Sequence, residues 1–270
     1  MHELAALDRA GRSSDVPAML LGIETGYEVE FDFPLRAAPP SRSYLLASVP
    51  RSGSTYVSHL LWQTGCLGAP LEYCNFEPSG PYGHASQSAV EQQRLWRAAL
   101  SRRTSPNGVF GLKGFPVQFE ALHHANPPLL ADVMRTLFPS PERGRIVLLH
   151  RRDRMAHAVS YARAILSGIW RAEQERGGRA EPEYSRVAVE RAGNMIESQE
   201  SAWKAMRADL KIAPLELWYE DVLADPAAAL DAVSGYLGIE IDPAAGVKVP
   251  PIERQSQQGA RAWAKRYTGG

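Results

Sequence analysis

Six consecutive residues, Pro50-Arg51-Ser52-Gly53-Ser54-Thr55, form the stretch best suited to chemistry. Their hydroxyl groups and one guanidinium are hydrogen-bond donors that suit phosphate-like oxygens. Gly53 has no Cβ, so the backbone there can approach a ligand closely. A helix that begins at this loop would add N–H groups without intrahelical acceptors, at the positive end of its dipole. The loop is therefore predicted to bind an anion.

The loop differs from the nucleoside-triphosphate-binding sequence Gly-x-x-x-x-Gly-Lys-[Ser/Thr]. Ser48 stands at the position of the first glycine, and Ser54 stands at the position of the lysine. Hydrolysis of ATP or GTP is therefore disfavoured. On these residues alone, an ordinary strand–turn–helix with a serine-rich helix start is the alternative interpretation.

Two further side chains are candidates for a role in catalysis. Glu72 lies among apolar neighbours, and burial there would raise the pKa of its carboxyl and favour general-base use near neutral pH. Lys113 ends the apolar run 109–112, and a lysine at the carboxyl end of a parallel strand points toward the usual ligand crevice. An ion-paired or helix-capping Glu72 and a solvated Lys113 are the simpler alternatives.

A second anion site is predicted where Arg151 and Arg152 follow the apolar run 145–149. Asp153 is a suitable N-cap for the next helix, and Ser160 lies about two turns along it. Surface arginines beside a polar helix face are the alternative. The sequence shows no Asp, Glu or His cluster with the spacing of a magnesium or zinc site, so no metal is expected.

The elements that must position these residues follow a strand–helix alternation. Apolar runs of strand length lie near residues 44–49, 109–113, 145–149 and 214–219. Helical patterns separate them, with start signals at Ser88 and Asp225 and a stop signal at Gly238. This order predicts an α/β fold of three layers, P-loop-like, in which helices flank a central and mainly parallel sheet.

Composition sets the remaining limits. The chain has 270 residues, and 30 Lys and Arg balance 30 Asp and Glu, so no global field favours nucleic acid or an anionic membrane. No apolar run approaches the roughly 20 residues of a membrane-spanning helix, and no secretory signal is expected from the first residues, which lack a basic segment followed by an apolar one. Cys66 and Cys74 are predicted to be buried thiols, and the cytoplasm is the expected compartment. Residues 1–41 are expected to form an arm or linker of unassigned role before a single α/β domain at 42–270.

Several segments, in order, resemble one family from about residue 42 to the end. The chain is similar to bacterial sulfotransferases of the trehalose 2-sulfotransferase type, which use 3′-phosphoadenosine 5′-phosphosulfate (PAPS). The matching segments are 44–55, 68–73, 106–113, 150–153 with 158–161, 169–171 and 252–255. Residues 1–41 lie outside the resemblance.

The resemblance implies a role for each candidate residue. Arg51, Ser52, Gly53, Ser54 and Thr55 would hold the 5′-phosphosulfate. The 3′-phosphate would lie on Ser160 and Arg151, with Arg152 as the other candidate. Arg254, in the tail, would close over the nucleotide. Glu72 would be the general base, and Lys113 would offset charge on the bridging oxygen.

The implied reaction moves a sulfuryl group from PAPS to a hydroxyl of a carbohydrate, glycolipid or other small molecule, without metal, and leaves 3′-phosphoadenosine 5′-phosphate (PAP). It is an in-line displacement that depends on positioning and charge stabilisation. The resemblance also implies a homodimer. Ala69 and Pro50 replace a Glu and a Gln of the trehalose pattern, which argues against trehalose itself as the acceptor.

Two other functions are compatible with the same elements. A small-molecule kinase of similar build is weakened by the missing lysine of the triphosphate loop and by the lack of an obvious Mg²⁺ ligand. A non-catalytic nucleotide-binding module is weakened because both candidate catalytic positions, Glu72 and Lys113, are occupied.

Overall fold

The computed structural model describes residues 24–171, 174, 181–252 and 257–269. One parallel sheet in the order β2-β1-β3-β4 forms its centre. The strands are β1 (Arg42–Ala47), β2 (Val109–Gly114), β3 (Ile146–His150) and β4 (Leu215–Trp218). The predicted α/β fold with a parallel central sheet is confirmed, and each predicted apolar run overlaps one of these strands.

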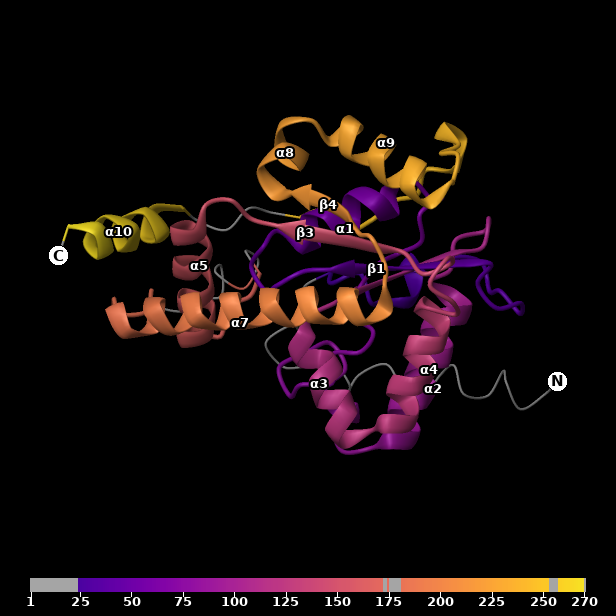
Figure 1. Cartoon of the computed structure of the whole chain (residues 1–270), viewed down its shortest axis with the longest axis horizontal. Helices are drawn as coiled ribbons and strands as arrows, with labels where there is room; N and C mark the ends of the chain where they lie inside the picture. Colours follow the sequence, from indigo (N-terminus) through magenta and orange to yellow (C-terminus); the bar gives the residue numbers. More distant parts are fainter. Residues whose placement is uncertain (1–23, 172–173, 175–180, 253–256, 270) are drawn as a thin grey trace.

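Both faces of the sheet are buried because successive side chains of a strand point to opposite sides. Leu46 and Val147 face one hydrophobic cluster, while Leu45 and Leu148 face the other. The helices α1 (Ser54–Gln63), α8 (Tyr219–Ala224) and α9 (Pro226–Leu237) cover the first face (Figure 1). The other face carries α2 (Ala89–Arg102), α3 (Pro116–Ala125), α4 (Pro127–Leu137) and α7 (Arg186–Leu210).

The helices α5 (Arg154–Ser167) and α10 (Gln257–Thr268) pack together at one end of the molecule (Figure 1). Trp263 of α10 is buried, and its ring centroid lies 5.3 Å from that of Tyr184. Short 3₁₀ helices η2 (Val29–Phe31), η3 (Gly83–Ala85) and η4 (Pro243–Ala245) complete the described elements.

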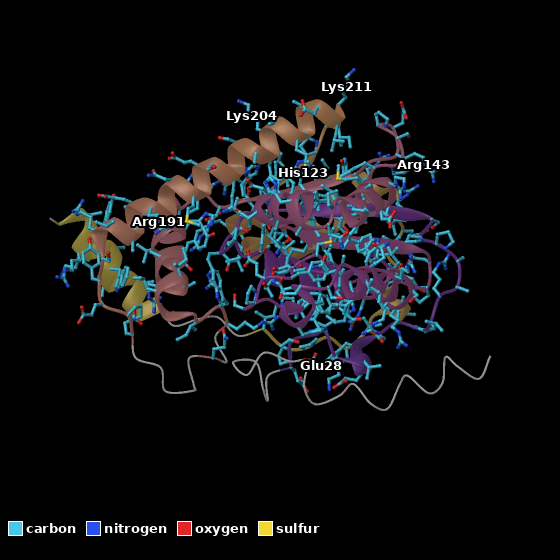
Figure 2. The ribbon with its side chains drawn as sticks, turned by 90° about the horizontal axis from the view of Figure 1, so that it is seen from below. Glu28, His123, Arg143, Arg191, Lys204 and Lys211 are labelled. Carbon is cyan, nitrogen blue, oxygen red and sulfur yellow. The ribbon has the colours of Figure 1, made fainter. Side chains whose placement is uncertain are left out.

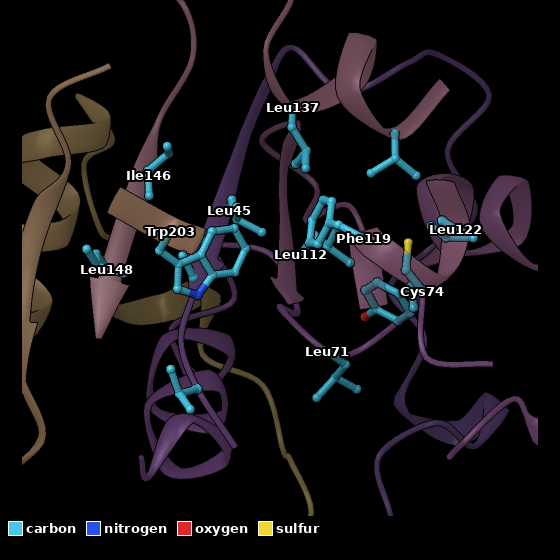
Figure 3. Close-up of a cluster of buried hydrophobic side chains, with 14 of the residues drawn as sticks. Leu45, Leu71, Cys74, Leu112, Phe119, Leu122, Leu137, Ile146, Leu148 and Trp203 are labelled. Carbon is cyan, nitrogen blue, oxygen red and sulfur yellow. The ribbon is translucent and has the colours of Figure 1, made fainter. Parts of the chain in front are cut away.

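Trp203 of α7 connects the larger core to the start of the anion loop. Figure 3 shows its indole beside Leu45, and the ring of Phe119 lies 5.6 Å away, centroid to centroid. The indole Nε1–H donates to the carbonyl of Ser48, 2.7 Å away. Because Ser48 follows β1 directly, the packing of α7 fixes the point at which the chain leaves the sheet.

The predicted helix signals are confirmed. The side chains of Ser88, Asp153 and Asp225 each accept a hydrogen bond from a backbone N–H of the first turn. Gly238 ends α9 in the left-handed conformation, at φ 61°. Cys66 and Cys74 are buried and free, as predicted.

The described part of the arm, residues 24–41, lies against the end of α2. Phe31 and Phe33 are buried in the larger core cluster. The guanidinium of Arg103, whose side chain is 5% exposed, pairs with Asp32 at 2.9 Å. It also donates to three backbone carbonyls of the arm, those of residues 26, 28 and 31.

Among the described residues, no helix is long and apolar enough to cross a bilayer. Arg191 and Lys204 are exposed residues of α7, the longest helix of this part of the chain, and Figure 2 shows Lys204 projecting away from the body of the molecule.

Replacing Arg103 with Met is expected to lower the free energy of unfolding by about 3 kcal/mol, because it leaves three arm carbonyls without their donor and removes a buried ion-pair partner. Arg102→Met is a matched control, since Arg102 donates to the same Asp32 but its side chain is 42% exposed. That change should cost less than about 1 kcal/mol. Urea unfolding measures both losses, and equal losses would contradict the structural importance of the Arg103 contacts.

Candidate active site

The loop between β1 and α1 has an unusual backbone. Gly53 is the N-cap of α1 at φ 91°, and no described side chain caps the helix. A Cβ at Gly53 would lie 2.2 Å from the ring of Tyr219, so a larger residue does not fit. Arg51 also has a positive φ, 69°, which is uncommon for a residue with a side chain. Such conformations cluster at ligand-binding sites.

The Ser52 hydroxyl lies inside this loop. The residue is 1% exposed, and its Oγ has no hydrogen-bond partner in the described part of the chain. A buried hydroxyl without a partner is costly unless a ligand completes it. Together with the N–H groups that begin α1, it suits an anionic oxygen. Ser54, the first residue of the helix, is also buried.

The structure brings the second predicted anion site against the first. Arg51 Nε donates to Ser160 Oγ over 3.1 Å, and another of its nitrogens donates to the Trp170 carbonyl. Arg151 donates to the backbone carbonyl of Arg51 at 2.9 Å, and its guanidinium lies over the ring of Tyr219, 5.7 Å from the centroid. Two cationic side chains and a hydroxyl therefore converge at the carboxyl ends of β1 and β3.

The Arg152 side chain binds Asp221 of α8 instead of the loop. Its guanidinium binds both carboxylate oxygens of Asp221 at 2.6 Å and lies 5.1 Å from the centroid of a Trp218 ring. Its backbone N–H donates to Glu220. The two adjacent arginines thus diverge, and Arg151 is the one that contacts the loop.

His157 of α5 forms a hydrogen bond with the backbone at the start of the loop. Its Nε2 lies 2.8 Å from the Pro50 carbonyl. A carbonyl only accepts, so Nε2 carries the proton of this hydrogen bond. Burial, together with the charges of neighbouring arginines and against the effect of the Pro50 carbonyl, lowers the pKa of His157 to about 4. The imidazole is therefore neutral at pH 7 and adds no charge to the arginine cluster.

Glu72 and Lys113 form a buried ion pair next to the first turn of α1. Lys113 Nζ lies 2.9 Å from Glu72 Oε1, with the two side chains 3% and 16% exposed. The same ammonium donates to Thr55 Oγ1 at 3.2 Å. Asn75 and Gln118 donate to Glu72 Oε2 at 2.8 and 2.9 Å. Thr55 therefore connects the carboxylate–ammonium pair to the anion loop.

The pKa of Glu72 corrects the sequence prediction. Burial by itself would raise it, as expected from the apolar neighbours. The Lys113 ammonium and the hydrogen bonds from Lys113, Asn75 and Gln118 outweigh burial and hold the pKa below its ordinary value. Burial lowers the pKa of Lys113, against the opposing effect of Glu72. Glu72 is therefore ionised in this arrangement.

The candidate residues thus gather in two groups joined by the loop. Arg51, Arg151 and Ser160 form one, and Glu72, Lys113 and Thr55 form the other. Ser52, Gly53 and Ser54 lie between them in the chain. Arg254 falls outside the described residues.

Sequence reasoning missed Asn75, Gln118, His157 and Tyr27 as partners of these groups. Gln118 stands at the N3 position of α3, where a glutamine is typical of a capping box, and its Oε1 does accept from the Phe115 N–H. Nothing in the sequence indicated that its amide also reaches Glu72, because that contact joins residues far apart in the chain.

Comparison with known families identifies the chain as a sulfotransferase, an enzyme that transfers a sulfuryl group from a sulfonate donor. The model of the Stf0 sulphotransferase family matches residues 43–269, and the chain belongs to this family. The resemblance inferred from the sequence motifs is therefore confirmed.

Two curated relatives carry the name trehalose 2-sulfotransferase. That of Mycolicibacterium smegmatis is 26% identical over 256 residues, covering 83% of this chain and 94% of the relative. That of Mycobacterium tuberculosis is 27% identical over 259 residues, covering 84% and 94%.

Similar solved structures are also sulfotransferases, at a greater distance. A sulfotransferase domain from the curacin biosynthetic pathway has a TM-score of 0.44 at 14% identity, covering 83% of this chain and 82% of that one. A sulfotransferase from Alicyclobacillus acidocaldarius has a TM-score of 0.41 at 13% identity, covering 87% and 92%.

The low pKa of His157 predicts that the free energy of unfolding decreases at acidic pH. An unfolded chain binds a proton at this histidine near pH 6.5, whereas the folded protein does so only near pH 4. Stability should therefore fall as pH drops from 6.5 to 4, by up to about 3 kcal/mol from this residue. His157→Gln keeps an amide donor near Pro50 and does not titrate, so it should lose less stability across that range. Urea unfolding at several pH values tests this, and an unchanged pH dependence would contradict it.

Proposed function

We propose that this sulfotransferase uses PAPS as its donor and a hydroxyl of a carbohydrate, or of a related small molecule, as its acceptor. The observation that carries the proposal is the buried Glu72–Lys113 pair held against Thr55 of the anion loop. The names of the two curated relatives support a sugar acceptor.

The residues of the loop suit a phosphosulfate. The buried Ser52 hydroxyl lacks a partner in the described part of the chain. Gly53 has no side chain, so the ring of Tyr219 packs directly on the loop. Arg51 lies at the same turn and contacts both Ser160 and Arg151, which supports these two residues as ligands of the 3′-phosphate. PAPS, when bound, supplies an activated sulfuryl group and a phosphate leaving group. The divergence of Arg152 toward Asp221 favours Arg151 as the ligand of the 3′-phosphate.

Glu72 would take the proton of the acceptor hydroxyl. The hydroxyl oxygen forms a bond to sulfur while the bond between sulfur and the phosphate oxygen breaks, giving a sulfate ester and PAP. Lys113 would stabilise the charge that develops on the departing oxygen. As negative charge develops on that oxygen, the Lys113 ammonium would interact more strongly with it and less strongly with Glu72. The pKa of Glu72 would then rise, and its carboxylate would become a stronger base.

The acceptor is proposed to differ from trehalose. Ala69 and Pro50 have no side-chain polar group at two positions where the trehalose pattern carries Glu and Gln. Ala69 is also fully buried, at 0% exposure, so it cannot contact a bound sugar in this arrangement.

Titration calorimetry with PAP, ADP and ATP, with and without Mg²⁺, tests the donor. PAP should bind most tightly and without metal, because only PAP has a 3′-phosphate. Arg151→Met should weaken PAP binding at least tenfold, which corresponds to about 1.4 kcal/mol, and Arg152→Met should leave it within about threefold. A preference for ATP with Mg²⁺ would indicate a kinase, and a larger loss in Arg152→Met would reverse the assignment of the two arginines.

Glu72→Gln tests the base. The variant should bind PAP as tightly as the unchanged protein but lose about a hundredfold or more in turnover, since general-base catalysis contributes about 10²–10⁴-fold. The assay measures PAP formed from PAPS with a panel of mono- and disaccharides that includes trehalose. Unchanged turnover would remove Glu72 from the mechanism. Stimulation by none of the sugars would contradict a carbohydrate acceptor.

A further inference from the structure

We infer that Tyr27 is a positioning residue for Glu72, and that the arm ahead of the family-matched region therefore completes the active site. The inference rests on the proposed role of Glu72 as the base. The family model begins at residue 43, so it assigns nothing to this arm.

Tyr27 contacts the backbone of the proposed base. Its hydroxyl oxygen accepts a hydrogen bond from the N–H of Glu72 at 2.9 Å. Its ring meets the rings of Tyr73 and Tyr82 edge to face, with centroids 6.3 and 5.4 Å away. The phenol is therefore held on one side by aromatic packing while it fixes the peptide group that carries the Glu72 side chain.

The peptide on either side of Glu72 is fixed by different groups. The carbonyl of Leu71 accepts from the N–H of Lys113 at 3.1 Å, which joins this segment to β2. The carbonyl of Glu72 accepts from the N–H of Asn75 at 3.1 Å. The N–H of Glu72, by contrast, has the Tyr27 hydroxyl oxygen as its acceptor. Loss of this hydrogen bond would let the carboxylate move relative to Lys113 and the acceptor.

A tight turn sets the direction of Tyr27. Glu28 Oε1 accepts from the N–H and hydroxyl of Thr25 at 2.8 and 2.7 Å, and Oε2 accepts from the Gly26 N–H at 2.7 Å. Gly26 has φ 90° and lies against Trp62, where a Cβ would come within 3.0 Å of the indole. Figure 2 shows Glu28 at the edge of the molecule. The turn therefore directs Tyr27 inward from a surface segment.

Two arginines hold the turn at residues 25–28 against the rest of the protein through hydrogen bonds to its backbone carbonyls. Arg103, buried at the end of α2, donates to the carbonyls of Gly26 and Glu28. Arg171 donates to the carbonyl of Thr25 at 3.1 Å, and its charge acts on the pKa values of both Tyr27 and Lys113. The turn is thus attached to both the α2 side and the segment that follows α5, and the position of Tyr27 is determined by the folded domain.

A double-mutant cycle tests the inference. Tyr27→Phe removes the hydrogen-bond acceptor of Glu72 and keeps the ring packing. In this variant, turnover of PAPS should fall about tenfold relative to the unchanged protein, while PAP affinity stays within about twofold. The acceptor in the assay is the most active sugar of the panel, or water if no sugar is active. In a Glu72→Gln background the same change should cause no further loss, because Tyr27 acts through Glu72.

Tyr44→Phe is the matched control. Tyr44 is fully buried, and its hydroxyl donates to the Leu67 carbonyl at 2.9 Å, so it also loses one tyrosine hydrogen bond. Its turnover should stay within about twofold of the unchanged protein. Amide hydrogen exchange gives a readout independent of activity, since Tyr27→Phe should speed exchange at the Glu72 N–H and Tyr44→Phe should not.

The outcomes separate the two hypotheses. Unchanged turnover in Glu72→Gln would overturn the proposed base and, with it, this inference. A strong loss in Glu72→Gln with no loss in Tyr27→Phe would overturn the inference alone. Equal losses from Tyr27→Phe in both backgrounds would also overturn it, because Tyr27 would then act independently of Glu72.

Discussion

The arrangement of the site depends on one ion pair, between Lys113 and Glu72. Removing two charges from water is expensive, and their attraction compensates only when the geometry is good and the remaining polar atoms are satisfied. Asn75, Gln118 and Thr55 supply those further contacts. The pair thereby brings together the end of β2, the segment around residue 72 and the first turn of α1. It also fixes the position of the anion loop, which leads into α1, relative to the Glu72 carboxylate.

Local interactions explain why much of the fold was predictable from the sequence. Strands buried on both faces are nearly continuous apolar runs, and a side chain that caps a helix lies within a few residues of the N–H it binds. The loop at 50–55 was predictable for the same reason. The parallel pairing of β1 with β2 and β3 then brings Arg51, Lys113 and Arg151 to the same edge of the sheet.

The remaining features depend on contacts between distant residues. The lowered pKa of Glu72 could not be predicted from its apolar neighbours, because Lys113 and Gln118 come from β2 and α3. The divergence of the two arginines depends on Trp218 and Asp221, which arrive with β4 and α8. The contacts of the arm and the helix α10 were not predicted either, since the apolar residues of both segments are few and find their partners only in the folded protein.

The ring of Tyr219 over Gly53 has a consequence for the order of assembly. The closest neighbour of the loop glycine belongs to the helix that follows the last strand, and His157 supports Pro50 from 107 residues further along. The loop therefore reaches its final shape only when every strand of the sheet is in place. Contacts of such long sequence separation form late and slowly. Any ligand that recognises the finished loop will stabilise the whole domain through mass action, and a chain truncated before β4 will not bind it.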